Sequence, residues 1–238
     1  MRCTLCAVML PLCVAAASGV AQTNVDATDK FAWHENVGWS NWADANAGAD
    51  GARVSGAHME GYVWFENAGW LDIGRGLPNT FDQYANTNNT NYGIKIDQTD
   101  GWLGGFGWQE NLGWFNFDTP GLEVTGQRAR LEIWQRRLVG YAWSENAGWL
   151  NMDDSSAFVG FDIGCAPADI TTTGSCVVLA SDGVVDLSDF SCYLSLWSTG
   201  GLNADITTTG VCSVGSGDDV VDLSDFSCYL AEWSSGCP

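Results

Sequence analysis

Six aspartates near the C-terminus have a spacing that suits calcium-binding loops. The segment D-G-V-V-D-L-S-D occupies 182–189, and D-D-V-V-D-L-S-D occupies 218–225. Calcium takes roughly six to eight oxygen ligands, which a loop supplies from carboxylates at near-alternating positions, a backbone carbonyl between them and a carboxylate at the start of a helix. The candidate ligands are therefore Asp182, Asp186 and Asp189 with the carbonyl of Val184, and Asp218, Asp222 and Asp225 with the carbonyl of Val220.

These aspartates belong to a tandem repeat. Segments 168–197 and 204–233 agree at 22 of 30 positions, which predicts two copies of one small unit that stack or face each other. Gly183 permits a sharp bend in the first copy, and the second copy has Asp219 there, which can adopt the left-handed conformation at some cost. Apolar residues then recur at helical steps and predict a helix from about Ser188 and Asp189, and its counterpart in copy two; in the first copy they are Phe190, Tyr193, Leu194 and Trp197.

Loop, helix and duplication together make residues 165–238 resemble a dockerin, the duplicated calcium-binding module of secreted bacterial proteins. The A-D-I-T-T-T-G openings and the terminal G-C-P resemble its GC-type variant. The resemblance implies a bound Ca²⁺ and tethering to a cohesin-like or other surface protein partner. The common dockerin loop has its early ligands four and two residues before the Asp-Gly, where this chain has Val178 and Ala180. We therefore expect a longer loop to supply those oxygens, from Asp169 and Thr171 in copy one and from Asp205 and Thr207 in copy two. The alternative is an acidic module that binds no metal.

Charge and cysteine content set this tail apart from the rest of the chain. Residues 165–238 hold ten acidic residues and no Lys, Arg or His, a balance that favours a cation partner. All six cysteines beyond residue 13 lie there: Cys165, Cys176, Cys192, Cys212, Cys228 and Cys237. Repeat symmetry favours the disulfides Cys176–Cys192, Cys212–Cys228 and Cys165–Cys237, although six cysteines allow other pairings.

The first 21 residues have the composition of a cleaved secretory signal: one basic residue, an apolar run and a small-residue stretch before Gln22. A lipoprotein site at Cys13 fits less well, because Leu12 stands where a small residue is needed. We therefore expect a secreted protein, extracellular or associated with the cell surface, and the remaining chain shows no apolar run of membrane length. A net charge of −20 argues against nucleic acid and anionic lipid as partners.

Residues 22–164 carry one phrase four times: W-H-E-N-V-G-W (33–39), W-F-E-N-A-G-W (64–70), W-Q-E-N-L-G-W (108–114) and W-S-E-N-A-G-W (143–149). Alternating residues on both sides of a Gly- and Asn-containing turn predict an antiparallel hairpin for each phrase. We expect further strands at 52–56, 92–96 and 130–134. The fold class is a mainly β domain of hairpins in a sandwich, barrel or propeller-like arrangement, followed by a small α-helical domain of duplicated calcium loops. The phrases resemble the Y-A-W-x-E-N-x-G-W-I-N-F repeats of secreted bacterial proteins.

The phrases indicate scaffold rather than catalysis. A catalytic carboxylate pair needs two unlike environments, whereas Glu35, Glu66, Glu110 and Glu145 share one context. Three tryptophans of residues 22–164 lie outside the phrases and are the better candidates for stacking on sugar rings: Trp42, Trp102 and Trp134.

Three functions follow as hypotheses. The first is a secreted non-catalytic protein, tethered by its tail, whose β domain binds a ligand or serves as surface structure. The second is a carbohydrate-binding or polysaccharide-degrading component of an extracellular complex, with polysaccharide as a partner. The acids outside the repeated frame, Asp118, Asp153 and Asp154, are not paired by any motif that would support catalysis. The third is a passive matrix component with buried tryptophans.

Overall fold

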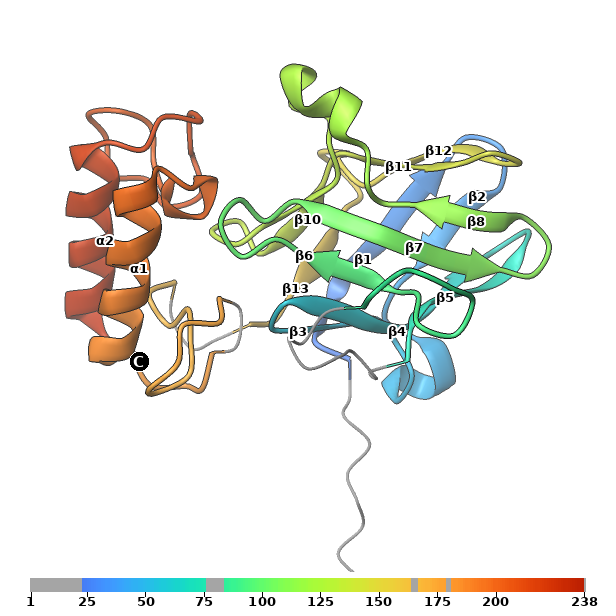
Figure 1. Cartoon of the computed structure of the whole chain (residues 1–238), viewed down its shortest axis with the longest axis horizontal. Coiled ribbons are helices and arrows are strands. Elements are labelled where there is room, and N and C mark those ends of the chain that lie inside the picture. The colour runs from blue at the N-terminus through green and yellow to red at the C-terminus, as the bar shows by residue number, and fades with distance from the viewer. Residues whose placement is uncertain (1–22, 76–83, 164–166, 179–180, 238) are drawn as a thin grey trace, which may run out of the picture.

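The computed structural model describes residues 23–75, 84–163, 167–178 and 181–237, so the expected signal segment 1–21 lies outside it. Within these residues, β-strands occupy the chain from Val25 to Phe161, and two α-helices follow from Leu187 onward. Figure 1 shows the helices side by side at one end of the strands. The mainly β front and the helical tail are therefore confirmed. In this described part, no helix is long and apolar enough to cross a membrane.

The four phrases build a closed barrel of eight antiparallel strands. Each phrase is one hairpin, neighbouring hairpins pair, and the last strand pairs back onto the first. Of the three architectures that the sequence left open, the structure has the barrel. Its hairpins are β1 (Val25–His34) with β2 (Gly38–Asn41), β4 (His58–Phe65) with β5 (Gly69–Gly74), β7 (Leu103–Gln109) with β8 (Gly113–Asn116), and β11 (Tyr141–Ser144) with β12 (Gly148–Asn151).

All four turns have the same register, which the sequence left undetermined. The two tryptophans of each phrase stand directly opposite each other, as Trp33 and Trp39 do. The glycine that closes each turn has a positive φ of 80°, 94°, 82° or 92°, at Gly38, Gly69, Gly113 and Gly148 respectively. A side chain would be strained there, which explains why the phrase ends in G-W.

This register divides the phrase between two faces of the barrel. The residue after the first tryptophan points inward and is fully buried in all four hairpins: His34, Phe65, Gln109 and Ser144. The tryptophans face outward, and each is between 38% and 46% exposed. Facing tryptophan rings are 4.6–4.9 Å apart between centroids, so they shield each other in part.

The asparagines of the phrases tie neighbouring hairpins together. Each donates from Nδ2 to a backbone carbonyl in the turn of the neighbouring hairpin. Asn67 bonds Val37 at 3.1 Å, Asn111 bonds Ala68 at 2.9 Å and Asn146 bonds Leu112 at 3.0 Å. Asn36 completes the ring with a 2.7 Å bond to Ala147 of the last turn. The repeated asparagine thus serves barrel closure.

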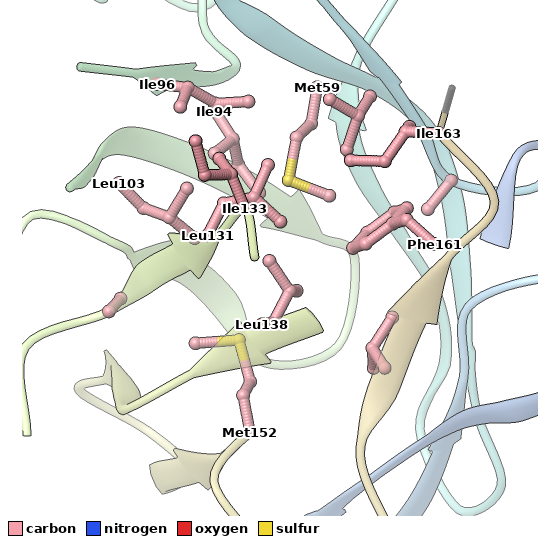
Figure 2. Close-up of a cluster of buried hydrophobic side chains, with 14 of the residues drawn as sticks. Met59, Ile94, Ile96, Leu103, Leu131, Ile133, Leu138, Met152, Phe161 and Ile163 are labelled. Atoms are coloured by element: carbon pink, nitrogen blue, oxygen red, sulfur yellow. The ribbon is translucent and has the colours of Figure 1, made fainter. Parts of the chain in front are cut away.

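Short strands extend the sheet beyond the barrel and surround part of the apolar core, where Met59, Ile94, Leu131 and Phe161 are buried (Figure 2). The expected strands at 52–56 and 92–96 are β3 (Arg53–Ser55) and β6 (Ile94–Ile96), and both pair with hairpin strands. The strand expected at 130–134 is β9 (Arg130–Glu132). It pairs with β10 (Arg137–Val139) and not with a hairpin strand, because the chain reverses at Arg136, which has φ 53°. β10 in turn pairs with β13 (Val159–Phe161). Short 3₁₀ turns occupy Ala45–Gly48, Pro120–Thr125 and Leu202–Ala204.

The two tail copies face each other as the repeat predicts, through α1 (Leu187–Thr199) and α2 (Leu223–Ser235). Tyr193 and Tyr229 stack with 3.7 Å between ring centroids and 6° between planes. Trp197 donates to the carbonyl of Asp222 at 2.9 Å, and Trp233 donates to that of Asp186 at 3.1 Å. Because each copy gives the other the same bond, the pair has approximate two-fold symmetry.

The Asn36→Ala substitution tests the asparagine ring. It removes the donor that links the first and last hairpins, so we expect the free energy of unfolding to fall by about 1 kcal/mol, the usual cost of one lost hydrogen bond. Denaturant unfolding measures this change. Glu35→Ala is the matched control, because Glu35 is exposed in the same turn and should change stability by less than ~0.5 kcal/mol. Equal losses in both variants would contradict a role for the ring.

Candidate functional site

The predicted calcium ligands of the tail surround the first turn of each helix. Asp186 is the N-cap of α1, where its Oδ1 accepts from Ser188 N at 2.6 Å. Asp189 completes a capping box, because its Oδ2 accepts from Asp186 N at 2.8 Å. Asp222 and Asp225 do the same for α2. The helix therefore begins at Leu187, one residue before the predicted start.

The last aspartate of each copy also holds the early part of its loop. Oδ1 of Asp189, which is fully buried, accepts from Ile170 N and Thr171 N, both at 2.9 Å. Asp169 in turn accepts from Asp182 N at 3.3 Å and from Gly183 N at 2.9 Å. Copy two repeats this network with Asp205, Asp218, Asp219 and Asp225. The structure thus brings Asp169 and Asp205 close to the backbone of the later aspartates Asp182 and Asp218.

The remaining predicted ligands have more local roles. Thr171 Oγ1 accepts from Val177 N at 3.0 Å, and Thr207 Oγ1 accepts from Ser213 N at 2.8 Å. The amides of Val184 and Val220 donate to Asp182 and Asp218. Sequence reasoning missed Thr173 and Thr209, whose hydroxyls donate to Asp186 at 2.8 Å and to Asp222 at 2.9 Å. Their place in the repeated T-T-T-G motif was the available signal.

The donor chemistry of these loops suits calcium, but their arrangement does not form a finished site. All candidate donors are oxygens, the preferred ligands of a hard cation. In the described ranges, however, no three His, Cys, Asp or Glu side chains are grouped so that they could hold a metal ion. Backbone amides occupy the carboxylate oxygens instead. The structure therefore shows a carboxylate network in each loop, and calcium binding by these loops remains a prediction.

Hydrogen bonds and burial move the aspartate pKa values in opposite directions. A backbone hydrogen bond from Thr173 lowers the pKa of Asp182, and one from Ser188 lowers the pKa of Asp186. Burial raises the pKa of Asp205 to about 6, and the nearby Asp225 and Asp218 add to this effect. At neutral pH the Asp205 carboxylate is therefore mostly ionised, although its buried position disfavours the charged form. A bound cation would offset this unfavourable burial of charge.

Disulfides attach each loop to its helix. Cys176 bonds Cys192 and Cys212 bonds Cys228, as repeat symmetry predicted. Cys237 is also disulfide-bonded, and its predicted partner Cys165 lies outside the described residues. Each disulfide joins the loop of its copy to the helix of the same copy, so both loops are attached in the same way.

Two of the three tryptophans predicted to stack on sugars are buried, so that prediction is wrong for them. Trp42 is fully buried in the front domain and donates to Ser40 Oγ at 3.1 Å. Trp134 is 6% exposed, because its ring packs against the Tyr193–Tyr229 stack and its Nε1 donates to Asn203 O at 3.1 Å. This contact joins the tail to the front domain. Trp102 is half-buried, and the guanidinium groups of Arg128 and Arg130 lie 5.1 and 5.5 Å from its ring centre.

Further contacts fix the tail against the turn between β6 and β7. Asn203 donates from its backbone to Thr99 O and from Nδ2 to Gln98 O, both at 3.0 Å. Leu202 N donates to Asp100 Oδ1 at 2.9 Å. These bonds and the Trp134 contact leave the outer sides of α1 and α2 open.

The acids outside the repeated frame are engaged in local structure. Asp118 pairs with Arg128 at 3.1 Å and Asp153 pairs with Arg137 at 2.5 Å. Asp154 accepts from Ser156 N and Ala157 N in a turn. The four glutamates of the phrases are exposed on the turns.

Comparisons with known proteins add no family. The chain matches no family model, no curated protein and no solved structure.

The bend position of the two loops provides a matched pair of substitutions. Gly183 has φ 83° and Asp219 has φ 62°, and each amide donates to the first aspartate of its loop. We expect Gly183→Asp to destabilise the protein and Asp219→Gly to stabilise it, each by about 1 kcal/mol, because only glycine adopts this conformation without cost. The loss of the Asp219 carboxylate should cost little, since its contact with Arg130 is long, at 3.9 Å, and the Asp219 side chain is exposed. Thermal unfolding in chelator measures both changes, and shifts in the same direction would contradict this account of the bend.

Proposed function

We propose that the chain is a secreted, non-catalytic protein that its C-terminal, dockerin-like module tethers to a cohesin-like surface partner in a calcium-dependent manner. The observation that carries the proposal is a pair of equivalent apolar faces on the outside of the tail. Leu187 is 71% exposed and Leu223, its counterpart 36 residues later, is 69% exposed. Val184 and Val220 are both 53% exposed beside them.

Each face has the make-up of a docking site. Isolated exposed leucines are ordinary on protein surfaces, but here the same residues recur with the same exposure in both copies. In copy one, a hollow of about 390 Å³ is lined by Leu187 together with Ser188, Ser191 and Ser195. An apolar centre with a polar rim is typical of protein interfaces. Because an approximate two-fold axis relates the two copies, a partner could bind to either of them.

Calcium would act by ordering these faces. Leu187 follows directly on the N-cap Asp186, so the position of the leucine depends on the carboxylate network of the loop. To hold the ion, the carboxylates of Asp169, Asp182, Asp186 and Asp189, with their counterparts in copy two, would have to turn from the backbone amides that they now bind. A bound cation would offset the mutual repulsion of these carboxylates and stabilise the folded loop by mass action.

The barrel supports a non-catalytic function, because the repeated phrase is accounted for by structure. Its glycine makes the turn, its asparagine ties hairpins together and its tryptophans pair across strands. Asp118 and Asp153 are neutralised by arginines. We therefore assign the barrel the task of presenting a surface while the tail holds the protein in place.

Binding of the full oxidised chain to purified cohesin domains tests the tether. We expect binding in calcium that is lost in chelator. Leu187→Asp or Leu223→Asp alone should weaken binding only about twofold, since the other copy remains, whereas the double variant should lose about 100-fold because both apolar centres are charged. Biolayer interferometry measures these affinities. Val124→Asp is the matched control, because Val124 is an exposed apolar residue of the front domain.

A calcium titration by calorimetry separates the two steps of the proposal. We expect the double variant Asp182→Asn, Asp218→Asn to bind calcium more weakly than the wild-type protein, and Asp162→Asn to bind it equally well. Absence of calcium binding would contradict the metal step. Calcium binding without any cohesin binding, or cohesin binding that survives the double leucine variant, would contradict the tether.

A further inference from the structure

The third hairpin differs from the other three in its aromatic surroundings. Trp114 lies 4.7 Å from Trp108, 5.0 Å from Tyr92 and 6.1 Å from Phe106, measured between ring centroids. Among the residues that the structure describes, the second tryptophans of the other phrases contact one or two rings. The additional ring, Tyr92, comes from the loop before β6. Trp114 nevertheless stays 40% exposed.

The rings of Tyr92, Phe106 and Trp114 form one wall of a hollow of about 340 Å³, and an asparagine-rich loop forms the other. The lining residues are Asn86, Thr87, Asn88, Asn89, Tyr92, Phe106 and Trp114. None of these side chains carries a formal charge at neutral pH. The volume is at the lower end of the roughly 300–1,000 Å³ found for small-molecule sites, which suits one or two rings of a longer chain.

The asparagine loop is held firmly in place. Asn91 Oδ1 accepts from Thr87 N at 2.9 Å and from Asn88 N at 3.1 Å, and Asn86 Oδ1 accepts from Gly93 N at 3.1 Å. A Cβ on Gly105 would lie 2.2 Å from Gly93 O and 2.5 Å from Asn86 Nδ2, so the loop packs on β7 at a distance that only glycine allows. The hollow is therefore preformed, and a ligand would find its wall already ordered.

Unused hydrogen-bonding groups lie along this ordered wall. Within the described residues, the side-chain nitrogen Nδ2 of Asn88 and the whole side-chain amide of Asn89 have no hydrogen-bond partner, and both residues are exposed. An amide offers two donors and an acceptor with two lone pairs. By contrast, the Tyr92 hydroxyl is occupied, since it donates to Asp72 Oδ2 at 2.8 Å, and this bond fixes the ring that faces Trp114.

We propose that this hollow binds a pyranose unit of a neutral polysaccharide, with Trp114 as the stacking platform and Asn88 and Asn89 as hydrogen-bond partners of the sugar hydroxyls. A pyranose presents an apolar C–H face and a rim of hydroxyls, which match an exposed aromatic ring beside free amides. An uncharged lining on a chain of net charge −20 disfavours anionic sugars and phosphates. This site is independent of the tail and goes beyond the tether.

Calorimetric titration of the full oxidised chain with defined hexasaccharides tests the site. The neutral probes are β-1,4-glucose, β-1,4-xylose, β-1,4-mannose and β-1,3-glucose hexamers, and the anionic probe is an α-1,4-galacturonate hexamer. We expect at least one neutral hexamer to bind and the anionic one not to bind. Trp114→Ala should weaken the binding about tenfold or more, because truncating a central aromatic contact usually removes much of the affinity.

Trp149→Ala is the matched control, because Trp149 has the equivalent position in the fourth hairpin and also faces a paired tryptophan. It should leave the affinity within about twofold, since it lines no part of the hollow. Asn89→Ala should weaken binding about threefold without affecting folding, as expected for one lost hydrogen bond at an exposed position. Failure of all four neutral hexamers to bind, equal losses in both tryptophan variants, or unchanged affinity in Trp114→Ala and Asn89→Ala would overturn the proposal.

Discussion

The structure depends on the closure of the barrel between its first and last strands. β12 pairs with β1, and the bond from Asn36 to Ala147 completes the ring of asparagines at the turns. Closure removes the free sheet edges that an open row of four hairpins would expose. It also gives every phrase the same neighbours, which explains why tryptophan, asparagine and glycine recur. The inward residues differ, as His34 and Phe65 show, because all four share one interior and must fill it together.

Local patterns predicted those parts of the structure that local physics decides. The hairpins followed from alternation and turn chemistry, the helices from apolar residues at helical steps, and two disulfides from the repeat. Closure could not be predicted, because it depends on the pairing of β1 with a strand more than a hundred residues away. The sequence also could not tell which tryptophans are buried. Trp134 is covered because Asn203, distant in sequence, accepts its indole hydrogen, whereas Trp114 remains half-exposed because the barrel wall turns it outward.

The tail combines a local network with a specific attachment to the front domain. Its buried carboxylates are satisfied by backbone amides, as buried charges require, yet ten acidic groups in this short segment have no basic residue of their own. The repeat symmetry appears on both sides of the helix pair. The inner sides of the helices meet in the Tyr193–Tyr229 stack, and the outer sides expose Leu187 and Leu223. Trp134 occupies the junction with both tyrosines. The surface proposed for the tether and the hollow proposed for the sugar therefore lie on different elements.

The central claim is that the four phrases form one closed, cooperative unit. Native-state amide hydrogen exchange at the β1–β12 seam, compared with exchange inside the hairpins, tests it most directly. If the barrel is closed, the hydrogen-bonded amides of the Trp33–Asn151 and His34–Leu150 region should exchange with the same free energy of opening as those between β4 and β5. Rapid exchange at the seam, with protection confined to single hairpins, would show an open row of hairpins and contradict the account.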